Sequence, residues 1–479
     1  MKTIAISKSN WHMGCILIRE STNRNLYSRE ANMKSFVFKQ ALFLIGATLI
    51  LVLLMGFFFF SSAHGGTPPC DLRAEFETAI LSSSWDDDWD DDWDEWEDNW
   101  DDDWDSDMDD WVNGDRAGLM LRYNRVEGLM AGMRMKREYW RERGSNRPFI
   151  YGHWGYAFAA KEFQYQAGLE KGMFDTFRFS FGGEYHRMID TPDRWIIQDE
   201  ENSIAAILLK EDFQDFYLRE GGSGYVMQNL TEAISLTAAY HVDEFRSVEK
   251  NTNWSIFGGK KQFRPNPAMD EGELKSISLK FEIDTRNSKK KTKSGWYIQM
   301  EGEHAGDDLN GDFTFDRALV DIRRFQPLGY QDGLDLRIRA GSSWGDMPWQ
   351  RRFHLGGLST LRAFRYKKFP CGPDQAGGNR MVLGQIEYRL GRQDLPDEID
   401  LGILENFYII LFADAGWVAH VDEGLDWTEG FDDLDYRDFK SDIGLALANR
   451  GGNMRFEIAR RTDTGHKPFM FWFRLNRPF

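Results

Sequence analysis

Nine histidines, three cysteines and 77 carboxylate side chains could carry acid-base, nucleophilic or metal chemistry in this 479-residue chain. The histidines are scattered, and the chain contains neither a His-Glu-x-x-His zinc motif nor a glycine-rich phosphate-binding loop. Each isolated histidine is therefore interpreted as a structural residue rather than a ligand. We predict a protein that is not an enzyme, with no catalytic residues and no cofactor or metal site.

The carboxylates are concentrated between residues 84 and 111, where 17 of the 77 acidic residues occur without any lysine or arginine. The tryptophans among them, together with Met108, recur every three or four residues, which is the spacing of one helical stripe. Two interpretations stay open. The segment is a disordered acidic linker, or it forms a helix when divalent cations such as calcium screen the carboxylates or when the tryptophan stripe meets a membrane interface or a partner. Outside this segment the charges nearly balance, so the formal charge of -18 predicts no nucleic-acid partner.

One apolar run, residues 40–60, interrupts a chain whose mean hydropathy is -0.55. Lys34 and Lys39 precede the run, and Ser61 and Ala63 follow it, as in a secretory signal peptide cleaved after Ala63. An uncleaved inner-membrane anchor is the alternative, but a single run excludes a polytopic helical membrane protein. The predicted regions are an N-terminal extension and signal peptide (1–65), an acidic Asp/Trp-rich low-complexity segment (66–113) and a β-barrel (114–479).

Export would remove Cys15 and leave Cys70 and Cys371 in a compartment that permits disulfides. Two cysteines cannot form a disulfide framework. They are expected either to make a single tether or to remain unpaired.

From residue 114 onward, apolar and polar residues alternate along many segments. Ile277, Leu279 and Phe281 alternate with Lys280 and Glu282, so that one face of the strand is apolar and the other is charged. Soluble β-sandwiches alternate too, but the export signal, the many long strands and the terminal phenylalanine favour a membrane barrel. The predicted strands are residues 122–138, 148–160, 163–170, 176–188, 224–246, 274–286, 295–305, 313–326, 332–345, 380–391, 406–418, 441–449, 454–462 and 468–477.

The predicted number of strands depends on whether residues 224–246 form one strand or two. Residues 224–246 are long enough for two strands, which brings the total to about fifteen, and closed single-chain barrels prefer even numbers. We therefore predict an all-β fold, a transmembrane antiparallel β-barrel of 16 strands.

Two insertions interrupt the predicted strands. Residues 202–218 carry apolar residues at helical spacing and are predicted to form a packed helix that ends at Gly221 and Gly222. Residues 421–440 form a long acidic loop, interpreted as solvated or, alternatively, as bridging lipid phosphates through divalent cations. The expected partners are outer-membrane lipids and, at the acidic segments, divalent cations.

Five segments between residues 350 and 479 resemble one family. They are residues 353–364 (FHLGGLSTLRAF), 377–379 (GGN), 385–389 (QIEYR), 412–416 (FADAG) and 456–460 (FEIAR). These segments are similar to the bacterial surface antigen superfamily, the BamA/TamA-like outer-membrane assembly and translocation barrels. The resemblance implies a protein of the bacterial outer membrane that acts in protein insertion, translocation or transport, with a client or secreted protein as partner. A passive porin or structural outer-membrane protein is the alternative.

The resemblance also implies a long loop that folds into the barrel lumen and carries an arginine motif at its tip. In the family this arginine pairs with carboxylates on the following strands. The matching residues are the loop glycines Gly356 and Gly357, the tip motif Leu361, Arg362, Ala363 and Phe364, and the partner carboxylates Asp414 and Glu387. Ala363 stands where the family has glycine, so a tight turn at this position is expected to be less comfortable.

Alternation independently predicts that both carboxylates point into the lumen. Leu411 and Ala413 belong to an apolar face that leaves Asp414 on the opposite face, and Glu387 lies opposite Ile386 and Tyr388. We therefore expect Arg362 to pair with Asp414, with Glu387 nearby.

Two further expectations concern the C-terminal residue of the predicted barrel and the segment that precedes the barrel. The terminal Phe479, after a strand with phenylalanines on one face, resembles the C-terminal assembly signal of outer-membrane barrels. The segment 66–113 is too short for a POTRA domain of the family, so we expect the chain to lack these domains.

Overall fold

The computed structural model describes most of the chain after residue 116. The described residues are 117–479 apart from 138–146, 174–177, 290–291, 330–331, 368, 370–376, 391–406, 422–426, 433, 450–453, 463–467, 476 and 478. The described residues all belong to one compact unit, Asp103–Phe479. The signal peptide, the Asp/Trp-rich segment, Cys70 and Cys371 lie outside the described residues.

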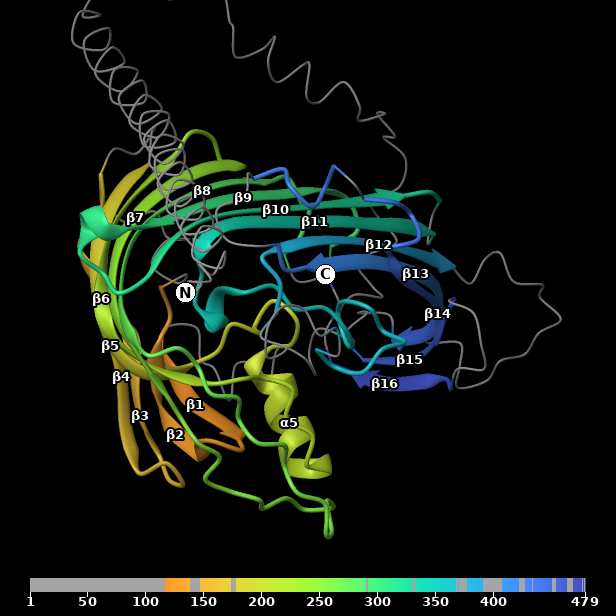
Figure 1. Ribbon diagram of the computed structural model, residues 1–479, viewed down its shortest axis with the longest axis horizontal. Coiled ribbons are helices and arrows are strands. Elements are labelled where there is room, and N and C mark those ends of the chain that lie inside the picture. Colours follow the sequence, from red (N-terminus) through yellow and green to blue (C-terminus); the bar gives the residue numbers. More distant parts are fainter. Residues whose placement is uncertain are drawn as a thin grey trace, which may run out of the picture. The chain divides into compact units, whose positions relative to one another are not determined.

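Within the described residues, sixteen β-strands form one antiparallel sheet in which each strand pairs with the next along the chain (Figure 1). The strands are β1 (Ala117–Asn124), β2 (Gly128–Met135), β3 (Phe149–Ala157), β4 (Glu162–Met173), β5 (Phe179–Asp190), β6 (Tyr217–Asn229), β7 (Ile234–Ser247), β8 (Gly272–Asp284), β9 (Gly295–Ala305), β10 (Thr314–Pro327), β11 (Gly333–Asp346), β12 (Arg380–Leu390), β13 (Phe407–Ala419), β14 (Lys440–Asn449), β15 (Arg455–Arg461) and β16 (Met470–Arg474). The predicted 16 strands and antiparallel order are confirmed.

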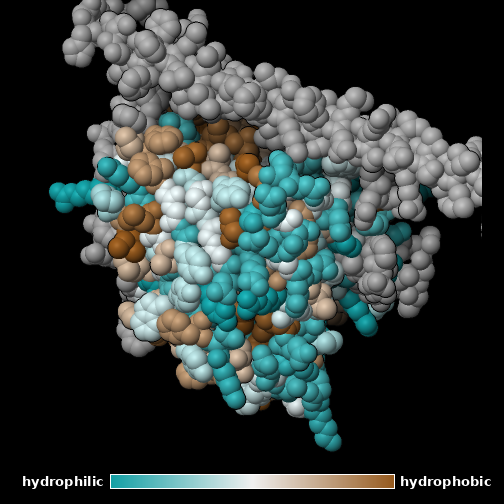
Figure 2. All heavy atoms as spheres, turned by 60° about the vertical axis from the view of Figure 1, so that its left-hand side comes forward, coloured by the Kyte–Doolittle hydropathy of each residue, from teal (hydrophilic) through white to brown (hydrophobic). Residues whose placement is uncertain are grey.

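The polarity of the two faces of this sheet is the inverse of that in a soluble protein, because apolar side chains are exposed and charged side chains are buried. Large apolar side chains such as Leu119, Ile338 and Phe456 are 49%, 56% and 56% exposed, whereas Arg337 and Asp414 are each 1% exposed. A soluble sheet would bury the apolar face, but a membrane barrel turns it toward lipid and keeps the polar face inside. Figure 2 shows one side of the molecule, on which hydrophobic side chains gather at the upper left and hydrophilic ones at the centre and lower right. The fold is a transmembrane β-barrel.

One predicted strand, residues 122–138, is instead a hairpin. The chain reverses between β1 and β2 at residues 125–127, where the Asn124 side-chain oxygen accepts the backbone N–H groups of Val126 (3.0 Å) and Glu127 (2.8 Å). Gly128 then adopts a φ of 63°, which glycine allows. The sequence does not reveal this turn, because residues 125–127 (Arg-Val-Glu) contain none of the glycine or asparagine dipeptides that are typical of tight hairpin turns.

The helical insertion exists, but its boundaries differ from the prediction. Helix α5 spans Asp199–Leu209 and ends at Lys210, whose left-handed φ of 56° terminates the helix. Gly221 and Gly222, the expected helix end, lie inside β6. Two short 3-10 helices, η1 (Asp307–Leu309) and η2 (Trp349–Arg351), complete the helical elements of the described residues. None of the helices in the described part of the chain is long and apolar enough to cross a membrane.

Candidate functional site

The connection between β11 and β12, residues 347–379, carries the arginine motif and is called the tip loop below. A tight turn forms just before the motif, where Gly356 N–H donates to Thr360 Oγ1 (2.9 Å) and Gly357 N–H donates to the Leu361 carbonyl (2.8 Å). Gly357 has a φ of 80°, and a Cβ atom on it would lie 2.9 Å from Tyr366 Cα. The turn therefore requires glycine at position 357.

Arg362 lies at the tip of this loop and is 0% exposed. Its Nε donates to Asp414 Oδ2 (2.7 Å) and its Nη2 donates to Asp414 Oδ1 (2.8 Å), which makes a bidentate pair. Its Nη1 also donates to Glu387 Oε1 (2.6 Å). The structure thus brings together the three charged residues that the sequence singled out.

Two further residues complete the environment of this guanidinium group. Glu457 Oε1 accepts from Arg362 Nη1 at 3.4 Å, and the Phe412 ring centroid lies 3.5 Å from the guanidinium carbon. Burial opposes the positive charge, but the carboxylates of Asp414, Glu457 and Glu387 together raise the pKa of Arg362 well above its usual value. Arg362 is therefore charged at every physiological pH.

A second arginine, Arg455, contacts the other two carboxylates, Glu387 and Glu457. Arg455 donates to both oxygens of Glu387, at 2.9 Å and 3.1 Å, and lies 3.2 Å from Glu457 Oε1. Sequence reasoning missed both Arg455 and Glu457. Their signal was available, because Glu457 alternates with Phe456 and Ile458 in the same way that Asp414 alternates with its apolar neighbours.

The backbone of the tip is also fixed. Ala363 N–H donates to Asp442 Oδ2 (3.0 Å), and Trp472 Nε1 donates to the Arg362 carbonyl (2.6 Å). Ala363 is not among the residues with positive φ. The expected discomfort of alanine at this position is wrong, since its backbone conformation does not require glycine.

The two apolar members of the motif pack against the barrel wall. Leu361 is 0% exposed and Phe364 is 5% exposed. Both join an apolar cluster with residues of the facing strands, among them Met381, Leu383 and Phe412. Burial of large side chains adds to the polar contacts that hold the tip in place.

A second anchor holds the tip loop to the connection between β5 and β6, residues 191–216. Lys367 Nζ lies 2.7 Å from Asp193 Oδ1 and 2.6 Å from Asp215 Oδ2. Ser359 Oγ donates to the Ile196 carbonyl (2.6 Å). The motif resemblance gave no indication of this anchor.

Phe479 lines a small cavity inside the barrel. The lining also includes Asp335, Glu387, Arg389, Arg455 and Arg477. Arg477 Nη1 donates to the Thr292 carbonyl (2.6 Å) in the turn between β8 and β9. The terminal phenylalanine therefore lies beside charged lumenal groups, and its role as an assembly signal stays a prediction.

One serine motif was overlooked in the sequence. Residues 341–345 (GSSWG) match the Gly-x-Ser-x-Gly pattern of serine hydrolases, in which the serine sits on a sharp turn between a strand and a helix. Here the central Ser343 lies within β11 and is 0% exposed. This placement does not fit a nucleophile turn. Within the described ranges, no group of three or more His, Cys, Asp or Glu side chains could hold a metal ion.

A substitution at Gly444 of β14 would test the packing of Phe412 against Arg362. A Cβ atom at this position would lie 2.2 Å from the Phe412 ring and 2.3 Å from the Ile458 carbonyl oxygen. Gly444→Ala is therefore expected to displace Phe412 from Arg362 and to lower the free energy of unfolding by about 1 to 3 kcal/mol. Urea unfolding of the protein in detergent micelles measures this change.

A strand glycine with open space provides the control. At Gly384 of β12 the nearest atom to an added Cβ is 3.9 Å away. Gly384→Ala should leave the unfolding midpoint within error of the wild type. Equal effects of the two substitutions would contradict the packing described here.

Comparisons with known proteins give two family matches. Residues 210–475, more than half of the chain, match the model of the Omp85 superfamily domain. Residues 108–287 match the C-terminal domain of a family of unknown function, DUF5686.

The outer membrane protein assembly factor BamA of Nitratidesulfovibrio vulgaris is 27% identical over 207 residues, which cover 41% of this chain and 24% of the relative. The chain therefore spans about a quarter of the length of that relative.

Solved structures matched by the chain include BamA from Haemophilus ducreyi lacking POTRA domains 1-3 and CdiB from Acinetobacter baumannii. The BamA structure is 15% identical with a TM-score of 0.47, covering 74% of this chain and 69% of that chain. The CdiB structure is 10% identical with a TM-score of 0.36, covering 74% and 58%. The family itself is shown by the domain model: this chain belongs to the Omp85 superfamily and is a protein of the bacterial outer membrane.

Proposed function

We propose that this barrel inserts or translocates client proteins at the outer membrane, and that the tip loop must be anchored inside the lumen for this activity. The observation that carries the proposal is the bidentate pair between Arg362 and Asp414, closed by Glu387, at the positions that the family resemblance marks. A loop that lay in the lumen without fixed contacts would not require a buried arginine with three carboxylate neighbours.

The free-energy cost of burying Arg362 and its carboxylate partners supports a functional role for these contacts. Each buried charge loses several kcal/mol of hydration, so a buried cluster is weak evidence for stability and stronger evidence for a fixed conformation. The cluster places the tip loop against β12, β13 and β15, and Trp472 of β16 holds its backbone. The loop is thus tied to the last strands of the sheet, which form one side of the barrel.

Reconstitution of the full chain into liposomes tests this proposal. We expect an unfolded outer-membrane β-barrel client to fold several-fold faster into these liposomes than into protein-free liposomes of the same composition. Planar-bilayer conductance of the same preparation should be small, because the tip loop and the residue 191–216 connection lie on the inner side of the sheet (Figure 1) and are joined there by Lys367. A large steady conductance without faster client folding would instead indicate a passive porin.

A further inference from the structure

Helix α5 contacts both ends of the sheet. The helix belongs to the connection between β5 and β6, so it is distant in sequence from the first strand, β1, and from the last strand, β16. Figure 1 shows α5 in the interval between β1 and β16. Backbone N–H groups on terminal strands need acceptors other than a neighbouring strand, and the helix provides some of these.

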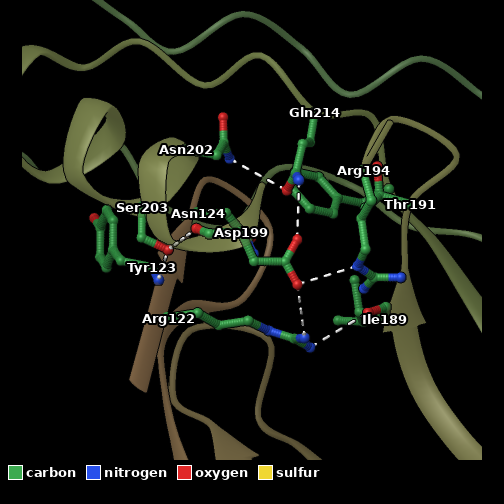
Figure 3. Close-up of a pocket in the computed structure, with 11 residues that line it drawn as sticks. Arg122, Tyr123, Asn124, Ile189, Thr191, Arg194, Asp199, Asn202, Ser203 and Gln214 are labelled. Carbon is green, nitrogen blue, oxygen red and sulfur yellow. Dashed lines mark hydrogen bonds and ion pairs between the residues drawn. The ribbon is translucent and has the colours of Figure 1, made fainter. Parts of the chain in front are cut away.

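The contacts with β1 involve two side chains of the helix. Ser203 Oγ accepts the backbone N–H of Tyr123 (2.9 Å), so the helix satisfies this strand amide. Asp199 lies 3.8 Å from Arg122 of β1 and accepts from Arg194 at 3.1 Å. Figure 3 shows the Asp199 carboxylate between these two arginines and Ser203 directed at Tyr123.

The contacts with β16 converge on a single carboxylate. Glu201 accepts from Arg474 Nε (2.7 Å) and Nη2 (3.2 Å), and it also accepts the backbone N–H of Leu475 (3.0 Å). Glu201 is 5% exposed and Arg474 is 1% exposed. Because both groups are charged and buried, removal of either one leaves the other without its counter-charge.

The opposite side of the helix exposes two large apolar side chains. Ile204 and Leu209 are 43% and 56% exposed, while the polar residues Glu201 and Ser203 are buried. A helix that only fills space in a soluble core would bury its apolar side chains. Helix α5 instead buries Glu201 and Ser203 against the terminal strands, and its exposed face carries Ile204 together with Glu200, which lies one turn earlier.

A neighbouring segment extends this apolar surface. Ile256 and Phe257, in the connection between β7 and β8, are 52% and 73% exposed. Their N–H groups donate to the Ile207 and Leu208 carbonyls near the end of α5, at 2.8 Å and 3.1 Å. These two carbonyls near the end of the helix therefore have hydrogen-bond donors from outside the helix.

We propose that α5 is a clasp that joins β1 to β16 and must release before the barrel wall can open between these strands. Ser203 holds the β1 side and Glu201 holds the β16 side. The consequence for client handling rests on the proposed function, whereas the clasp itself does not. An open wall would expose the Tyr123 and Leu475 amides together, because one rigid helix caps both.

Hydrogen exchange of the full chain in lipid nanodiscs tests the clasp. Glu201→Ala is expected to speed exchange of the Leu475 amide and of the Tyr123 amide by about tenfold or more, since hydrogen bonds to charged groups are among the strongest. Amides in the β10 and β11 ladder should not change. Glu200→Ala is the matched control, because Glu200 is the adjacent carboxylate of the same helix and is exposed.

Ser203→Ala is the second variant and removes only a hydroxyl group from the other side of the clasp. It should also speed exchange at both amides. Wild-type exchange at both amides in Glu201→Ala would overturn the clasp. Faster exchange at Leu475 alone would also overturn it, because the two sides would then be independent.

Client folding separates the clasp from the proposed function. If the wild type accelerates client folding, Glu201→Ala should change that rate several-fold and Glu200→Ala should not. An unchanged rate in Glu201→Ala, with the wild type active, would overturn the requirement for release. If the wild type does not accelerate client folding, the proposed function fails, and the exchange measurement still decides whether α5 is a clasp.

Discussion

Replacing Arg362 with alanine is expected to lower the free energy of unfolding by about 3 to 5 kcal/mol, because the buried Asp414 carboxylate would lose its counter-charge. Asp414→Ala should have a similar cost for the converse reason. The double variant should be little less stable than either single variant, since both single changes break the same bidentate pair. Urea unfolding of all four proteins in detergent micelles gives the coupling free energy.

The same loop provides a control for the loss of positive charge. Arg365 lies three residues after Arg362 and is exposed. Arg365→Ala should change stability by less than about 0.5 kcal/mol, as for most exposed positions. Fully additive costs in the Arg362 and Asp414 cycle would show that the two side chains do not act as a pair.

Lys367→Met should produce the second large effect, and this effect should depend on pH. Burial raises the pKa of the Asp193 carboxyl above its usual value, although the Lys367 ammonium opposes the shift. Without Lys367 the pKa of Asp193 would rise further, so the folded state would bind a proton that the unfolded state does not bind. The destabilisation is therefore expected to be about 3 kcal/mol near pH 8 and to shrink as the pH falls toward about 5.

Urea unfolding at several pH values measures this dependence. Lys260→Met is a suitable control, because Lys260 is exposed in the connection between β7 and β8. It should show neither the loss of stability nor the pH dependence. A cost of Lys367→Met that grows as the pH falls would contradict the assignment of Asp193 as the group that takes up the proton.

Much of the fold could be predicted because strand alternation is a local property. One face of each strand must meet lipid and the other must face the lumen, so the period of two is visible without knowing which strands pair. The same logic placed Asp414 and Glu387 on the inward face. Only the resemblance could connect them to Arg362, since alternation does not say what a lumenal carboxylate contacts.

The missed features depend on contacts between distant segments. Lys367 binds Asp193 across 174 residues, and Arg474 binds Glu201 across 273 residues. Nothing in the local sequence around Asp193 or Glu201 indicates these partners. The C-terminal boundary of α5 was missed for a different, local reason, because the helix ends at Lys210 in a left-handed conformation rather than at a glycine.

The central claim is that Arg362 anchors the tip loop for client insertion or translocation. Its most direct test compares client folding rates in liposomes that contain equal amounts of folded wild type, Arg365→Ala or Arg362→Ala. We predict that the wild type and Arg365→Ala accelerate folding equally and that Arg362→Ala falls to the rate of protein-free liposomes. Full acceleration by folded Arg362→Ala would contradict the claim.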